Sequence, residues 1–303
     1  MKHLLKLLDL SAEEIMELLN IADQLKYEHR NGIPHRRLEG KTLAMIFQKS
    51  STRTRVSFES GMYQLGGHAL VMSASDLQMG RGEPIHDTAR VLSRYCDAIM
   101  IRTYSQDEVE NLAEAGSIPV INGLTDFCHP CQILADLMTI RERKQGLQGL
   151  KLAFVGDANN MSNSLIVGCL KMGMRIAVAC PEKYHFDQRI LDFAKGYDGF
   201  TLTTDPKVAA AGADVLETDV WASMGDEGEA EQRKRDFAGY QINEELLVVA
   251  NPECMVLHCL PAHRGEEITA EAFEDHADEI FEEAENRMHA QKAVLLKLIG
   301  MQN

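Results

Sequence analysis

Two arginines stand among small hydroxyl residues in the segment Ser51-Thr-Arg-Thr-Arg55. The segment follows an apolar run at 42–47 and leads into a stretch whose apolar residues have helical spacing. Hydroxyls beside the free backbone N–H groups of a helix start form a cradle for an anion. Arginines in a first helical turn oppose the helix dipole, which indicates that a bound anion offsets their charge. The alternative is an exposed helix start with solvated arginines.

Polar residues of the same kind end or follow other apolar runs. Arg102 closes the run 98–102, where its guanidinium could hold a phosphate or carbonyl oxygen or form a structural ion pair. His129-Pro-Cys-Gln132 opens a helical stretch, with proline at the favoured first position. A lone histidine is usually a surface or satisfied core residue. We single out His129 because it would share a sheet edge with Arg53 and Arg102, and Gln132 could face the same ligand from that helix start.

The second half of the chain has three further polar segments after apolar runs. Val155-Gly-Asp-Ala-Asn-Asn160 lacks the G-x-G-x-x-G pattern of a dinucleotide loop, so its asparagines favour a small polar ligand. In Asp219-Val-Trp-Ala-Ser-Met-Gly225 the carboxylate could hold an ammonium group or cap a helix. In His258-Cys-Leu-Pro261 the thiol of Cys259 could be a nucleophile, a ligand contact or a packed thiol. No Cys/His/Asn context supports the nucleophile.

The cysteines predict a reducing compartment. There are seven, an odd number, and they are scattered among apolar neighbours. Cys128 and Cys131 have the C-x-x-C spacing of a redox dithiol or half a zinc site, but no second such pair completes a zinc set. The chain starts without a secretory signal and has no apolar run of ~18 residues. We therefore expect a cytoplasmic protein without a metal, a cofactor or a membrane partner.

The elements that must position these residues form a repeating pattern. Apolar runs alternate with helical stretches, which indicates parallel sheets flanked by helices. With 303 residues, 45% of them hydrophobic, the chain can build two cores, and the polar segment 141–149 is the best candidate boundary between them. A helix at 11–26 and a final helix at 281–299, able to cross back, complete the prediction. The expected strands are 42–47, 69–73, 98–102, 118–122, 151–155, 175–180, 214–218 and 255–259.

The overall charge excludes one class of partner. The formal net charge is −15, so a general basic surface for nucleic acid or anionic lipid is absent. Any anion site must be local. Because active sites of open α/β sheets lie beyond the carboxyl ends of strands, the polar residues after each run are the best site candidates.

Taken together and in order, these segments resemble the aspartate/ornithine carbamoyltransferase family over essentially the whole chain. Ser51-Thr-Arg-Thr-Arg55 is similar to its carbamoyl-phosphate signature, and Arg102 and His129-Pro-Cys-Gln132 match its further contacts. Asp219 to Gly225 and His258 to Pro261 resemble the ornithine branch, since the aspartate branch would want cations for a second carboxylate. That branch usually has threonine where Cys131 stands, a small change that also explains the C-x-x-C spacing.

The resemblance implies a fold and an activity. Residues 1–143 plus 283–303 would form a carbamoyl-phosphate-binding domain, with the last helix returning to it, and residues 144–282 an ornithine-binding domain. The chain would transfer the carbamoyl group to the δ-amine of L-ornithine, giving L-citrulline and phosphate without a cofactor. A loop carrying Gln78 would reach a neighbouring subunit's site, implying a homotrimer or an assembly of trimers.

The resemblance also implies a role for each site residue. Arg102, His129 and Cys259 would be catalytic. Asp219 would pair with the α-ammonium of ornithine, with Asn160, Ser223 and Met224 holding the rest of the molecule. The residues implied to contact carbamoyl phosphate are Ser51, Thr52, Arg53, Thr54, Gln78, Arg102, His129, Gln132, Cys259, Leu260 and Arg287.

Alternatives remain open at this point. The nearest are transferases for putrescine, acetylated or succinylated ornithine, or aspartate. A nicotinamide-dependent oxidoreductase and a non-catalytic trimeric binding protein are rivals of other classes. The sequence does not distinguish the synthetic from the citrulline-consuming direction, trimer from larger assembly, or which group accepts the amine proton.

Overall fold

The computed structural model describes residues 1–73, 77–78, 82–222 and 227–300. The chain divides into two compact units. Unit 1 is Met1–Ala135 with Asn286–Asn303, and unit 2 is Asp136–Glu285. The divisions fall inside two helices, α5 (Pro130–Lys144) and α12 (Ala277–Leu295), so each of these helices contributes residues to both units.

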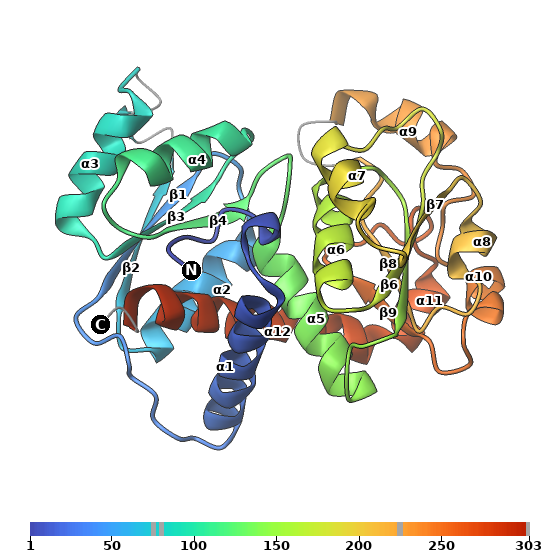
Figure 1. The fold of residues 1–303 in the computed structure, drawn as a ribbon, viewed down its shortest axis with the longest axis horizontal. Helices are drawn as coiled ribbons and strands as arrows, with labels where there is room; N and C mark the ends of the chain where they lie inside the picture. Colours follow the sequence, from blue (N-terminus) through green and yellow to red (C-terminus); the bar gives the residue numbers. More distant parts are fainter. Residues whose placement is uncertain (74–76, 79–81, 223–226, 301–303) are drawn as a thin grey trace. The chain divides into compact units, whose positions relative to one another are not determined.

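Unit 1 contains a four-stranded parallel sheet in the order β2-β1-β3-β4. Helices cover both of its faces (Figure 1). Buried residues of α3 and α4 pack with β1, β3 and β4 in one apolar core. The strands are β1 (Thr42–Phe47), β2 (His68–Ser73), β3 (Ala98–Arg102) and β4 (Val120–Leu124), and the helices are α1 (Ala12–Arg30), α2 (Thr52–Gln64), α3 (Ile85–Tyr95) and α4 (Gln106–Ala115).

The C-terminal helix returns to unit 1, as predicted. Its later residues contact α2, where the Lys292 ammonium donates to Gln64 Oε1 at 2.9 Å. Gly61 makes room for this contact, because a Cβ there would lie 3.0 Å from Lys292 Cγ. Burial lowers the pKa of Lys292 to about 8. The return of α12 brings Arg287 into unit 1.

Unit 2 contains a five-stranded parallel sheet in the order β7-β6-β5-β8-β9. Its strands are β5 (Lys151–Val155), β6 (Arg175–Ala179), β7 (Phe200–Thr203), β8 (Val215–Thr218) and β9 (Met255–His258). Its helices are α6 (Asn160–Lys171), α7 (Gln188–Ala194), α8 (Pro206–Ala210), α9 (Ala230–Asp236), α10 (Glu244–Val249) and α11 (Ala270–Asp275).

The predicted fold class is confirmed: two parallel sheets flanked by helices, with strands at or within two residues of the expected positions. The predicted first helix begins behind its capping box, in which Ser11 and Glu14 each bind the other's backbone N–H. Strand β7 was not predicted. It is a short edge strand with two exposed residues, so it lacks the apolar run that marked the others.

Each sheet has a point where the strand order reverses. In unit 1 the chain builds outward from β1 to β2 and then from β3 to β4, so the reversal lies between β1 and β3. In unit 2 it lies between β5 and β8. Ligands of open α/β sheets bind beyond the carboxyl ends of the strands at such points. The segments after β1, β3, β5 and β8 therefore form the best candidate sites.

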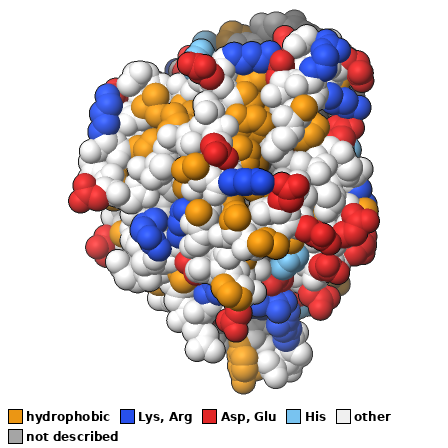
Figure 2. Space-filling view, turned by 90° about the vertical axis from the view of Figure 1, so that its right-hand side faces the viewer, with side chains coloured by type: hydrophobic (Ala, Val, Ile, Leu, Met, Phe, Trp, Pro, Cys, Tyr) orange, Lys and Arg blue, Asp and Glu red, His pale blue; other side chains and the backbone are white. Residues whose placement is uncertain are grey.

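The surface in Figure 2 carries acidic, basic and hydrophobic side chains side by side, so no continuous basic field covers this face. None of the helices in the described ranges has the length and apolar character that a membrane span requires.

Gly123 is a position where the packing of β4 can be tested. It lies at an irregularity in the β3–β4 register, and a Cβ there would meet Met100 Sδ at 2.5 Å and the Ile101 carbonyl oxygen at 3.2 Å. Gly123→Ala should lower the free energy of unfolding by about 1–3 kcal/mol through overpacking. Gly146→Ala is the matched control, because nothing lies within 4 Å of its Cβ position. Equal stability of the two variants in urea unfolding would contradict this packing.

Candidate active site

The start of α2 is built as an anion cradle. Ser51 precedes the helix in extended conformation, and its hydroxyl oxygen accepts the Thr54 N–H at 3.2 Å. Ser51 also donates to Thr54 Oγ1 at 3.1 Å. Thr52 and Arg53 are exposed in the first helical turn, whereas Thr54 is buried. The exposed N–H end of α2 thus lies beyond β1, beside the point where the strand order reverses.

Arginine side chains from three elements gather at this cradle. We call Arg53 of α2, Arg102 of β3 and Arg287 of α12 the arginine cluster. Arg102 and Arg287 are each 5% exposed, and both donate to Thr54 Oγ1, over 3.5 and 3.4 Å respectively. Arg287 also donates to Gln132 Oε1, on the first turn of α5. The structure therefore brings together six of the residues singled out in the sequence: Ser51, Arg53, Thr54, Arg102, Gln132 and Arg287.

His129 lies against the arginine cluster as an uncharged ring. It is 5% exposed, and its pKa is held well below 6.5 by burial first, and then by the charges of Arg287, Arg102 and Arg53. A neutral imidazole keeps one N–H to donate. Guanidinium groups held this close repel one another in a medium of low dielectric constant, and a bound anion relieves that repulsion. The arrangement suits an oxyanion or a phosphate.

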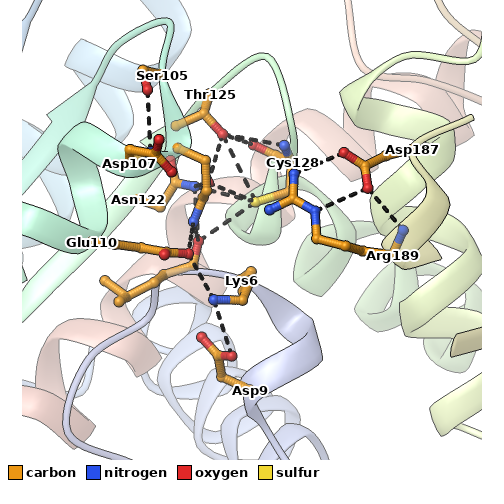
Figure 3. A network of polar contacts seen from close by, with 12 residues as sticks. Lys6, Asp9, Ser105, Asp107, Glu110, Asn122, Thr125, Cys128, Asp187 and Arg189 are labelled. Carbon is orange, nitrogen blue, oxygen red and sulfur yellow. Dashed lines mark hydrogen bonds and ion pairs between the residues drawn. The ribbon is translucent and has the colours of Figure 1, made fainter. Parts of the chain in front are cut away.

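A polar network fixes the turn that leads to His129 (Figure 3). Thr125 Oγ1 donates to Gln106 Oε1 at 2.8 Å and accepts the Cys128 N–H at 3.2 Å. Asn122 Nδ2 donates to the Leu5 carbonyl at 2.8 Å, which ties the N-terminal segment to the same turn. Sequence reasoning did not single out Gln106, Asn122 or Thr125. Their roles depend on contacts between distant segments, for which the sequence carries no local signal.

The C-x-x-C pair is part of the packing. Cys128 and Cys131 are buried free thiols, and burial raises the pKa of each to about 12. A redox dithiol needs a lowered pKa, so this reading is not supported. Cys131 donates to the Asn122 carbonyl at 3.5 Å.

In unit 2 the centre of the candidate site is Asp219, directly after β8. Its Oδ2 accepts from Asn159 Nδ2 at 2.9 Å, and its Oδ1 accepts the Val220 N–H at 2.8 Å and the Cys259 thiol at 3.2 Å. Asp219 is 8% exposed. Asn159 and Asp219 lie in the segments that follow β5 and β8, the two strands between which the order reverses. The structure thus joins three segments that the sequence had marked separately.

Sequence reasoning missed Asn159, which contacts Asp219. The sequence drew attention to Asn160, which is the first residue of α6 and half-buried. Asn159 is the residue before the helix: its side-chain oxygen caps the N–H groups of Met161 and Ser162, which leaves its amide nitrogen to donate to Asp219. The two adjacent asparagines were the only signal for this contact.

Cys259 and Leu260 follow β9 in a constrained turn. Burial, together with Asp219, raises the pKa of the Cys259 thiol well above 9.0, so the group is a neutral donor and a poor nucleophile. Leu260 has a φ of 58°, a left-handed conformation that costs a bulky residue about 1–3 kcal/mol. Its N–H donates to His258 Nδ1 at 3.0 Å, and His258 Nε2 lies 3.1 Å from Glu267 Oε1.

Three further predicted site residues, Gln78, Ser223 and Met224, are not part of the contacts described above. Gln78 is exposed. Ser223 and Met224 lie outside the described residues.

One group among the described residues could share a metal ion. The side chains of His263, Glu266 and Glu267 offer ligand atoms within 4.8 Å of one another. Glu266 already pairs with Lys234 at 2.9 Å, and Glu267 accepts from the His263 backbone N–H at 2.5 Å and faces His258. Since these carboxylates have cationic or N–H partners, we assign no metal to them.

Comparison with known proteins gives the family. Residues 2–142 match the family model described as aspartate/ornithine carbamoyltransferase, carbamoyl-P binding domain. Residues 148–298 match the companion model described as the Asp/Orn binding domain. Together the two models cover nearly the whole chain.

Whole-chain relatives agree with both models. The chain is 53% identical over 300 residues to an ornithine carbamoyltransferase of Geobacter sulfurreducens, covering 98% of this chain and 99% of the relative. The solved ornithine carbamoyltransferase of Pyrococcus furiosus is 52% identical with a TM-score of 0.95, covering 100% of this chain and 98% of that one. The Thermus thermophilus structure is 43% identical, with a TM-score of 0.90 and 99% of both chains covered. The chain belongs to the aspartate/ornithine carbamoyltransferase family.

Proposed function

We propose that the chain is an ornithine carbamoyltransferase, which transfers the carbamoyl group of carbamoyl phosphate to the δ-amine of L-ornithine and yields L-citrulline and phosphate. The observation that carries this proposal is the arginine cluster around the neutral His129. It provides positive charge for a phosphate and an N–H donor for a carbonyl oxygen in one buried place. Relatives that share half of the sequence over its whole length are named for this activity.

The two substrates are assigned to different parts of the chain. Residues 1–143 with 283–303 bind carbamoyl phosphate, and residues 144–282 bind ornithine. The descriptions of the two matching family models support this assignment. So do the charges: the cradle in unit 1 is cationic, whereas the centre in unit 2 is the carboxylate Asp219.

Carbamoyl phosphate is activated by donors that are in place before the reaction. Negative charge grows on its carbonyl oxygen during attack and then passes to the departing phosphate, so preorganised donors supply much of the rate gain. Arg102, His129 and Thr54 serve the carbonyl oxygen. Ser51, Thr52, Arg53, Gln78, Gln132 and Arg287 serve the phosphate.

Ornithine is held by its amino-acid end. Asp219 pairs with the α-ammonium, and Asn160, Ser223 and Met224 hold the rest of the molecule. Cys259 and Leu260 lie near the reacting centre, where the protonated thiol is a donor. Arg102, His129 and Cys259 make up the catalytic set. Addition of a neutral amine to this activated carbonyl requires donors and orientation, which these side chains supply without a cofactor.

The assembly and location are proposed together. We propose a homotrimer, or an assembly of trimers, in which the loop carrying Gln78 completes a neighbouring subunit's site; the exposure of Gln78 supports this. We also propose that the protein works in the cytoplasm, because all seven cysteines are free thiols and six of them are buried.

The acceptor is tested by a panel of amines. Purified protein receives carbamoyl phosphate with ornithine, acetylornithine, succinylornithine, putrescine or aspartate, and each carbamoylated product is measured. Turnover with ornithine and background levels with the others is the expected result. Turnover with another amine would keep the proposal for the arginine cluster and overturn the one for Asp219. Absence of turnover with all five would favour a non-catalytic binding protein.

The role of the arginine cluster is tested by replacing two nearby arginines of α2, Arg53 and Arg55, one at a time. Arg53→Ala should raise the KM for carbamoyl phosphate strongly, since losing a charged hydrogen bond costs about 1.5–3 kcal/mol, or roughly 10- to 150-fold. Arg55→Ala is the matched control, because exposed Arg55 pairs with half-buried Glu59 at 3.0 Å within the helix. We expect the Arg55 variant to keep its KM. Equal KM values for the two variants would remove Arg53 from the site.

A further inference from the structure

Glu217 is a buried acid that the proposed mechanism does not use. It lies on β8, two residues before Asp219, and is 0% exposed. Its strand neighbours are Phe154 of β5 and Leu257 of β9. Among the described residues, no donor group gives a hydrogen bond to either of its carboxylate oxygens. Full burial of an ionised carboxylate without donors is strongly unfavourable, which favours the protonated, uncharged form of this side chain.

The groups that face Glu217 are themselves acids. In the described part of unit 2 they are Asp136 of α5, Glu283 of α12, Cys169 of α6, and Asp219 and Cys259 beyond the strands. Glu283 already accepts the His258 N–H at 2.9 Å. The pKa of Glu217 is raised well above 4.5, by burial first and then by Asp136, Glu283 and Asp219.

Adjacent carboxyl groups in a buried site relieve their repulsion by keeping a proton on one of them. A protonated Glu217 gains an O–H donor, and Asp136, the acid that raises its pKa most, lies within hydrogen-bond reach to accept it. Such a bond joins β8 to α5 across the core of unit 2.

We propose that Glu217 is a positioning residue: it stays a neutral carboxylic acid in the folded protein, donates its O–H to Asp136, and thereby fixes the end of β8 that carries Asp219. Strand β8 lies between β5 and β9, and Asp219 contacts Asn159 and Cys259, which follow those two strands. A shift of β8 would therefore disturb all three residues together. This consequence for ornithine rests on the proposed function, whereas the protonation of Glu217 does not.

The proton has a consequence for stability. The folded protein binds this proton at pH values where the unfolded chain has released it. The free energy of unfolding therefore falls as the pH rises from about 4.5 toward the raised pKa of Glu217, and this group adds no further loss above that value. In this window the unfolding constant of the wild type should rise relative to Glu217→Gln by up to about tenfold per pH unit.

The first test is infrared spectroscopy near neutral pH. The wild type should show the C=O stretch of a protonated carboxylic acid, carbon-13 labelling of glutamate should shift it, and Glu217→Gln should lack it. An absent band, a band that survives in the variant, or one unaffected by glutamate labelling would each overturn the proposal.

The second test compares two uncharged replacements in steady-state kinetics. Glu217→Gln retains a donor to Asp136 and should keep both KM values. Glu217→Leu removes the donor and should raise the KM for ornithine about tenfold, as small misplacements do, while leaving the KM for carbamoyl phosphate unchanged. Equal kinetics for the two variants, or equal loss for both substrates, would contradict positioning. If the wild type shows no turnover at all, the proposed function is refuted, and the infrared band alone then tests whether Glu217 is protonated.

Discussion

The candidate site of unit 1 depends on one electrostatic arrangement: three guanidinium groups gather around a buried, uncharged imidazole. Arg53, Arg102 and Arg287 come from a helix start, a strand end and a returning C-terminal helix. Burial first, and then the charges of these three groups, lower the pKa of His129 and keep its ring neutral. The buried charges of Arg102 and Arg287 repel each other in a medium of low dielectric constant, and an anion bound beside them relieves that repulsion. The strand order, which places the ends of β1 and β3 side by side, and the return of α12 both serve this one arrangement.

Unit 2 has the opposite electrostatic character. Asp219 is the acceptor for three donors, from its own turn and from the segments after β5 and β9, and the thiol of Cys259 remains protonated beside it. Each unit thus presents the charge opposite to that of the group we propose for it, a phosphate in one case and an ammonium in the other. The neutral acid we infer at Glu217 fits this proposal, because it leaves Asp219 as the carboxylate assigned to ornithine.

Sequence patterns predicted most of the fold and the types of residue at the site, because apolar runs, capping residues and turns are local signals. Ser11 with Glu14 and the strand of Arg102 are examples. Contacts between distant segments were not predictable in this way. Asn159, rather than its neighbour Asn160, reaches Asp219 because a helix cap fixes its orientation, and Gln106 supports the turn before His129 through a fold-dependent network. Strand β7 lacked an apolar run.

Isotope labelling tests most directly whether the chain transfers the carbamoyl group to the δ-amine of ornithine. Carbamoyl phosphate labelled with carbon-13 and ornithine labelled with nitrogen-15 at the δ-position would be incubated with the protein and the product examined by NMR. A one-bond carbon–nitrogen coupling in the new ureido group, which requires bond formation at the δ-amine, is the predicted result. A product without that coupling, in which the carbon-13 of the carbamoyl group is bound to the unlabelled α-nitrogen, would contradict the proposal that Asp219 orients ornithine by its α-ammonium.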